Sequence, residues 1–228
     1  MIGIICAMKI ELEKIKEIAT DCKTVHSGSF EYTTGMIYGK HIIMCVCGVG
    51  KVNAALCAHT MIMSFSPDLI INVGVAGNLS KELNIGDIAI ADRLVQHDMD
   101  TSALGDPPGF ISGIDKVYFD TDKKVVKTIS DICKELGVKY LEGTIATGDK
   151  FIADMKDKDR IVACFNAIAC DMEGAAIAQA CYIGNTLFAA IRAISDDADG
   201  KSPQDFGEFC RISAHNCANV VKEFIEKY

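Results

Sequence analysis

The sequence predicts an α/β fold: a single three-layer α/β/α sandwich domain over residues 1–228, built on a mixed central sheet. Three observations predict it. Short apolar runs typical of buried strands alternate along the chain with segments of helical periodicity. A length of 228 residues suits one large domain with a sizeable core. Finally, the chain contains no repeat, low-complexity tract or long polar linker that would divide it.

The first half of the chain begins with a continuous apolar run, 2–7, which is typical of a central parallel strand. A helix over 11–19 follows directly, with Leu12, Ile15 and Ile18 on one face, and starts the α/β pattern. The further elements expected in this half are a hairpin of 30–38 and 41–47 joined at Gly39 and Lys40, a buried small-residue helix over 51–63 ended by Pro67 and Asp68, and strands at 69–75 and 86–95.

The second half opens with the clearest loop of the chain, 101–115, which is rich in glycine and proline. A helix beginning at Asp120 carries an apolar stripe, and Gly137 is its expected left-handed stop. The remaining expected elements are strands at 144–147, 167–172 and 187–194, helices at 154–164 and 173–181, and a last helix over 204–227.

Charge and composition exclude several classes of protein. The chain has 31 acidic and 23 basic residues, a net charge of -8, and no block of Lys and Arg. It therefore lacks the electrostatic footprint of a nucleic-acid or anionic-membrane binder, and a small neutral or cationic ligand is favoured. Residues 1–8 do not read as a signal peptide, and no apolar run reaches the ~18 residues of a membrane helix.

The eleven cysteines are interpreted as free thiols in a reducing cytoplasm. Their number is odd, and most lie inside apolar runs: Cys6, Cys45, Cys47, Cys57, Cys170 and Cys181. Cys45 and Cys47, the one close pair, do not have zinc-knuckle spacing. No metal site is predicted.

Polar residues that follow strands are the first place to look for a site, because ligands of open α/β sheets bind beyond the carboxyl ends of strands. The glycine-rich segment CGVGKVN (47–53) fails the phosphate-loop pattern, since Val52 stands where Ser or Thr is needed. It also lacks the third glycine of the dinucleotide fingerprint, so a tight turn with a close-packed helix start is its simpler interpretation.

Three acids at separate strand ends are more informative. Asp196 follows a strong strand, where partial burial would raise its pKa enough for proton donation. Glu173 lies at a strand-to-helix junction and could accept hydrogen bonds from a sugar diol. Taken singly, Asp196 reads equally as a cap or loop residue, and Glu173 and Glu11 as first-turn helix acids. Together the three could converge on one crevice.

Seven segments carry a resemblance to a known family: GIICAMKIE, CGVGKVNAA, NVGVAG, GDIAIAD, TGDKFI, DMEGAAIA and RAISDDAD. In this order they resemble the 5'-methylthioadenosine/S-adenosylhomocysteine nucleosidases of the nucleoside phosphorylase superfamily, over essentially the whole chain. The resemblance implies a nucleoside phosphorylase-like domain. It also implies hydrolysis of the N-glycosidic bond of both nucleosides, with 5'-deoxyadenosine as a further candidate. No cofactor is implied, and the family forms homodimers whose pockets the neighbouring subunit completes.

The resemblance also assigns roles to individual positions. Glu11 would activate the attacking water, Asp196 would protonate N7 of the departing adenine, and Ser195 would hold the Asp196 carboxylate or the base edge. The substrate-binding positions it implies are Phe151 stacked on adenine, the Ile152 backbone on its Watson–Crick side, Met172 and Glu173 at the ribose, Met8, Val49 and Phe206 around the 5'-substituent, and Ala76 and Gly77.

Two departures from the family pattern bear on substrate preference. Val75 stands where Ser is common, and the short loop 101–113 carries Leu104 where Phe is usual. Three rival functions remain open. A phosphorylase would need cations around phosphate, and Arg192 is the one candidate to reach an anion. A catalytically dead nucleoside-binding protein is the second rival, and a nucleosidase for futalosine or AMP is the third.

Overall fold

Strands and helices alternate along the chain, as the sequence periodicity predicts. The computed structural model describes residues 1–199 and 206–228, and the side chain of Phe206 lies outside this described part. In chain order the elements are β1 (Ile2–Cys6), α1 (Lys9–Glu17), β2 (Thr20–Ser27), β3 (Phe30–Ile37), β4 (Lys40–Val46), α2 (Lys51–Phe65), β5 (Leu69–Asn78), β6 (Ile88–Gln96), the short 3-10 helix η1 (Ser102–Leu104), β7 (Tyr118–Asp120), α3 (Lys123–Leu136), β8 (Tyr140–Thr147), α4 (Met155–Phe165), β9 (Ala167–Asp171), α5 (Gly174–Ile183), β10 (Leu187–Asp196) and α6 (Phe206–Lys227).

The ten strands form one mixed sheet in the order β10-β6-β8-β9-β5-β1-β4-β3-β2, with β7 paired to β6. Strand β1 lies parallel to both β4 and β5, so the expectation of a central parallel strand is confirmed. Strand β5 also pairs with β10 and β9. These extra pairings close β5, β10, β6, β8 and β9 into a ring, a feature that periodicity alone does not predict.

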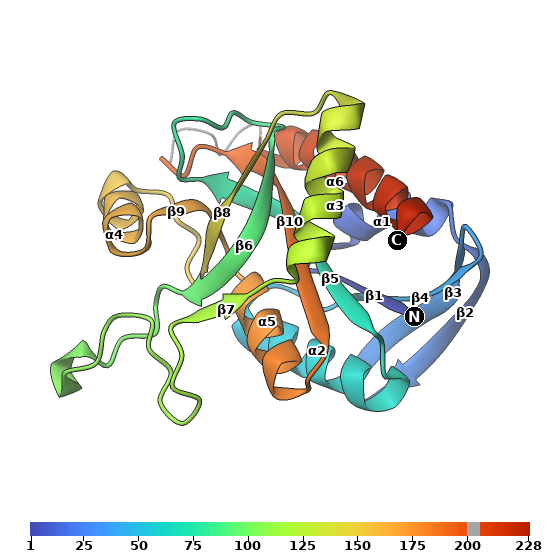
Figure 1. Ribbon diagram of the computed structural model, residues 1–228, viewed down its shortest axis with the longest axis horizontal. Coiled ribbons are helices and arrows are strands. Elements are labelled where there is room, and N and C mark those ends of the chain that lie inside the picture. Colours follow the sequence, from blue (N-terminus) through green and yellow to red (C-terminus); the bar gives the residue numbers. More distant parts are fainter. Residues whose placement is uncertain (200–205) are drawn as a thin grey trace.

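Helices cover both faces of the sheet (Figure 1). Helices α2 and α5 pack together on one face, while α1 and α3 pack against α6 on the other. Strand residues alternate between the two faces, as the two-residue period of a strand requires. Ile4 of β1 belongs to the core beneath α1, α3 and α6, whereas its neighbour Ile5 belongs to the core beneath α2 and α5. The predicted α/β fold with a mixed sheet is therefore confirmed.

Several expected boundaries need correction. Strand β2 was not predicted, because all but one of its side chains are exposed and it has no apolar face. Strand β7 was not predicted, because it has only three residues. Strand β10 was expected to end at residue 194, but it continues through Ser195 and Asp196. The predicted stop at Gly137 is confirmed, with φ 67°. The expected start of the last helix at 204 lies outside the described residues.

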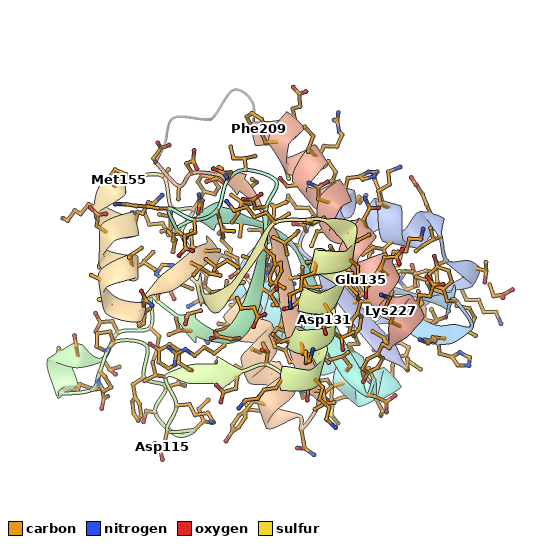
Figure 2. All side chains as sticks on the ribbon, turned by 45° about the horizontal axis from the view of Figure 1, so that its top comes forward. Asp115, Asp131, Glu135, Met155, Phe209 and Lys227 are labelled. Carbon is orange, nitrogen blue, oxygen red and sulfur yellow. The ribbon has the colours of Figure 1, made fainter. Side chains whose placement is uncertain are left out.

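The loop that follows β6 projects away from the body of the molecule (Figure 1), and Figure 2 shows Asp115 on one of its outer turns. The six cysteines that the sequence placed in apolar runs are all buried, and all eleven cysteines are free. Cys22 and Cys164 are exposed. Among the described residues, no helix is long and apolar enough to cross a membrane.

Candidate active site

One pocket gathers the three acids that the sequence singled out. It has a volume of about 210 Å³, and its walls are mainly apolar. The residues that line it come from the ends of β1, β5, β9 and β10, from the first turn of α1, and from the segments that follow β4 and β8: Ala7, Met8, Glu11, Val49, Val75, Ala76, Gly77, Lys150, Phe151, Ile152, Cys170, Asp171, Met172, Glu173, Ser195 and Asp196. Eleven of the twelve residues expected at the site are in this set. The twelfth, Phe206, has its side chain outside the described residues.

Glu11 is buried at the start of α1 and held by two backbone amides. Its Oε2 accepts a hydrogen bond from Met8 N at 2.8 Å, and its Oε1 accepts one from Val75 N at 3.0 Å. Burial raises the pKa of Glu11, while the Arg192 guanidinium and the amide donors work in the opposite direction. The interpretation of Glu11 as a first-turn helix acid is thus correct, since its Oε2 closes a capping box. The other oxygen ties the carboxylate to β5 and fixes it at the pocket.

Asp196 ends β10 with both oxygens engaged. Its Oδ2 accepts from the Ser195 hydroxyl at 2.9 Å, and its Oδ1 accepts from Ala198 N at 2.9 Å. Burial raises the pKa of Asp196, while the Ser195 hydroxyl and the Ala198 amide lower it. A carboxyl group with a raised pKa at the wall of an apolar pocket is suited to donate a proton near neutral pH.

Glu173 precedes α5, and it does not cap its own helix. Instead, its Oε1 accepts from Gly50 N, the residue before α2, at 2.9 Å. Burial raises the pKa of Glu173 to about 7, although the nearby Arg192 lowers it. A carboxylate fixed in this way retains free acceptor positions for a hydroxyl-bearing ligand.

Arg192 lies fully buried behind the pocket. Its Nη2 and Nε contact Asp171 Oδ2 at 2.5 and 2.9 Å, and Nη2 also donates to the Asn72 side chain. Glu173 Oε2 is 3.9 Å from the same nitrogen. The expectation that Arg192 could reach an anion is therefore wrong, because a guanidinium with no exposed surface cannot contact a ligand in the pocket.

The pocket is lined by more acids than cations. Among the described residues that line it, Lys150 is the one cation, and its ammonium group is paired with Asp157 and Asp154. Four of the lining residues are acids. Such a lining offers little to bind phosphate and favours a neutral or cationic ligand.

Comparison with known proteins decides the family. The Phosphorylase superfamily model matches residues 1–226. The chain belongs to the phosphorylase superfamily. This superfamily member is 37% identical over 99% of its length to an aminodeoxyfutalosine nucleosidase of Campylobacter jejuni, with 98% of that protein covered. It is 34% identical to a 5'-methylthioadenosine/S-adenosylhomocysteine nucleosidase of Staphylococcus aureus, with both chains covered completely.

A solved structure of such a nucleosidase from Neisseria meningitidis, in complex with methylthio-immucillin-A, superposes with a TM-score of 0.96. That protein is 34% identical to this superfamily member, and the match covers 100% of this chain and 99% of the chain in the solved structure. The resemblance drawn from the seven sequence segments is confirmed by these relatives.

Five residues that line the pocket of this superfamily member were not among the expected site residues: Ala7, Val75, Lys150, Cys170 and Asp171. Asp171 is the most informative, since it accepts hydrogen bonds from both Arg192 and Thr147. Its signal in the sequence was its place at the end of an apolar strand, one of the positions where polar residues were sought. Among the described residues, no group of three His, Cys, Asp or Glu side chains could hold a metal ion.

Proposed function

We propose that this chain is an N-glycosyl hydrolase that cleaves 5'-methylthioadenosine and S-adenosylhomocysteine to adenine and the 5-substituted ribose. One observation carries the proposal: an apolar pocket is lined by Glu11, Glu173 and Asp196, each with a pKa raised by burial. The names of the relatives agree with it, since they include nucleosidases for these substrates.

Each acid has a distinct task in this mechanism. Cleavage of the C1'–N9 bond builds positive charge on the ribose ring and negative charge on the purine. Asp196, protonated, donates to N7 of the leaving adenine, and Ser195 orients its carboxyl group. Glu11, ionised and held by two amides, accepts a proton from the attacking water. Glu173 accepts hydrogen bonds from the ribose hydroxyls.

The remaining lining residues bind the substrate. Phe151 stacks on the adenine, and the Ile152 backbone pairs with its Watson–Crick side. Met172, Ala76 and Gly77 contact the nucleoside, and Met8 and Val49 surround the 5'-substituent. No cofactor or metal takes part in this mechanism, because a protonated acid and an activated water suffice for the hydrolysis.

Water rather than phosphate is the proposed nucleophile. Glu11 occupies the wall where a phosphorylase would need a cation, and Arg192 is sealed behind Asp171. The deciding experiment measures adenine release from 5'-methylthioadenosine with and without phosphate. Release at the same rate in both supports hydrolysis. Release that requires phosphate, or no release at all, overturns the proposal.

The 5'-substituent is the part of the substrate to define next. Val75 lines the pocket, and one relative at 37% identity is named for aminodeoxyfutalosine. A panel of 5'-methylthioadenosine, S-adenosylhomocysteine, 5'-deoxyadenosine and aminodeoxyfutalosine, compared by kcat/KM, ranks the substrates directly. A preference of more than about tenfold for aminodeoxyfutalosine, worth about 1.4 kcal/mol, would replace the proposed substrates by that one.

We also propose that residues 1–228 act as one domain in a cytoplasmic homodimer. Exposed apolar side chains on α2 and in the loop after β6 suit a subunit interface: Val52 is 69%, Met63 70% and Leu104 83% exposed. The free thiols fit a reducing compartment. Size-exclusion chromatography with light scattering tests the dimer, and a monomeric mass contradicts it.

A further inference from the structure

Three charged residues from separate parts of the chain form a closed ring beside the pocket. The Lys51 ammonium donates to Asp98 Oδ1 at 2.6 Å. The other Asp98 oxygen, Oδ2, accepts from Asp149 N at 2.9 Å, and Asp149 Oδ1 accepts from Lys51 N at 2.8 Å. Lys51 begins α2, Asp98 follows β6, and Asp149 follows β8. Each of the three is thus bonded to the other two.

The chain neighbours of this ring line two sides of the pocket. Val49, two residues before Lys51, lines it, and Gly50 N donates to Glu173. Lys150, Phe151 and Ile152 come directly after Asp149 and line it as well. The ring therefore joins the turn that contacts the ribose-binding acid to the segment 150–152 on the base side.

The start of α2 needs partners from elsewhere in the fold. Its cap residue is Gly50, which has no side chain to accept the first amides of the helix. Two carboxylates from other segments take that place: Glu173 accepts from Gly50 N and Asp149 accepts from Lys51 N. Gly50 has φ +99°, and a Cβ there would lie 3.1 Å from Asp149 Oδ1, so glycine permits this close approach.

The pocket residues beside the ring lie on exposed loop segments. Val49 is 50% exposed and Phe151 is 54% exposed, and both lie outside helices and strands. The side chain of Asp98 is 29% exposed. Although burial opposes it, the hydrogen bonds from Lys51 and Asp149 N hold the pKa of Asp98 below its ordinary value. Asp98 is therefore ionised at neutral pH.

We infer that Lys51, Asp98 and Asp149 are positioning residues that fix the spacing between the base-binding segment 150–152 and the ribose-binding side of the pocket. The glycine-rich turn at 47–51 thus serves the site through its amides and its lysine, although it does not match the phosphate-loop pattern. This inference rests on the proposed function for the identity of the substrate, but the ring itself does not depend on it.

The kinetic test uses Asp98→Ala, which removes both bonds of Asp98, and Lys51→Met, which leaves the bond between Asp98 and Asp149 intact. We expect kcat/KM for 5'-methylthioadenosine to fall about tenfold to a hundredfold in Asp98→Ala, mainly through KM, because misplacing binding groups by about 1 Å has that effect. The double variant should lose no more than Asp98→Ala, since the two residues act as a unit.

The second readout is independent of activity. Hydrogen exchange of the free protein, followed by mass spectrometry, should show faster exchange in peptides covering 47–51 and 148–153 of Asp98→Ala, with other peptides unchanged. The matched control is Asp131→Ala. It removes an ion pair of the same 2.6 Å length, with Lys127, from the outer surface of α3 (Figure 2). This control should keep wild-type kinetics and wild-type exchange in both peptides.

The outcomes separate the two proposals. If the wild type releases no adenine, the proposed function fails, and faster exchange confined to 47–51 and 148–153 still supports the ring. If Asp98→Ala keeps wild-type exchange and a wild-type KM, the inference is overturned. Loss of protection across the whole chain in both Asp98→Ala and Lys51→Met would also overturn it, because the ring would then support the fold rather than position the site. Lys51→Met keeps the test possible if Asp98→Ala does not fold.

Discussion

Asp196→Asn is the variant that separates binding from chemistry most cleanly. Asparagine keeps the size of the side chain and can keep both contacts, accepting from Ala198 N and pairing with the Ser195 hydroxyl. It cannot supply a carboxylic proton to the leaving purine. General acid catalysis contributes about 10²–10⁴-fold, so we expect kcat to fall by that factor, which is about 2.7–5.4 kcal/mol of barrier.

The assay is continuous adenine release under saturating 5'-methylthioadenosine, with substrate affinity measured separately by calorimetry on Asp196→Asn. We expect the dissociation constant to stay within about fivefold of the wild-type KM, because the lost interaction is made in the transition state. Asp197→Asn makes the same chemical change at the exposed neighbour and should stay within about fivefold of wild-type activity. A kcat for Asp196→Asn near that of the wild type would refute the assignment of the acid.

Three further outcomes follow from the buried groups. Gly74→Ala should abolish activity, because the added Cβ would lie 2.6 Å from Glu11 Oε1 and closer still to the Arg192 guanidinium. The control is Gly207→Ala, whose Cβ would meet no atom within 4 Å and which should not destabilise the fold in a thermal melt. Arg192→Met should lower the free energy of unfolding by about 3–5 kcal/mol in urea, since it leaves buried carboxylates without their cation. In urea unfolding, the wild type should be less stable at about pH 7.5 than at about pH 5. This difference in stability should be smaller in Glu173→Gln.

The sign of the last effect follows from the raised pKa. In the folded chain the pKa of Glu173 is about 7, against an ordinary value of 4.5. Neutral Glu173 therefore contributes stability that is complete below about pH 4.5 and is lost as the pH rises through about 7. A Glu173→Gln variant with an unchanged pH dependence would contradict the assignment of this shift to Glu173.

Arg160→Met, which alters a half-exposed cation, is the control for Arg192→Met and should change the free energy of unfolding by less than about 1 kcal/mol.

Periodicity predicted most of the fold because buried strands and amphipathic helices leave a repeating apolar signal. Strand β1 and helix α3 are examples, with their core residues at the expected spacing. Strand β2 left no such signal, since its stability comes from backbone pairing with β3 at an exposed edge. The pairing of β5 with β10, which closes five of the strands on themselves, could not be predicted either, because a pairing between strands distant in the sequence leaves no local pattern.

The site, like the fold, has residues that the sequence predicts and partners of those residues that it does not. Residues just after strands could be named in advance, because the carboxyl ends of parallel strands share one edge of a sheet. The partners of those residues could not. The sequence presents Arg192 as a cation free to bind phosphate, and only the pairing with Asp171 shows that it is neutralised and sealed. Lys51, Asp98 and Asp149 lie 47 and 51 residues apart along the chain, so their ring appears only in three dimensions.

The buried arginine also explains why one acid donates a proton while another accepts one. Burial raises the pKa of Glu11 and of Asp196, so burial alone would make both carboxyl groups donors. For Glu11, the largest opposing influence is the positive charge of Arg192, joined by the backbone amides. For Asp196, the largest opposing influence is instead the Ser195 hydroxyl, followed by the Ala198 amide, and the charge of Lys158 contributes less than either. The position of Arg192, close to Glu11, thus favours an ionised base there and leaves Asp196 as the acid.

Removing the Ser195 hydroxyl should accordingly raise the pKa of Asp196 further and extend the active range toward higher pH, which a pH profile of kcat for Ser195→Ala would reveal. A basic limb that stays in place or moves to lower pH would contradict this division of roles.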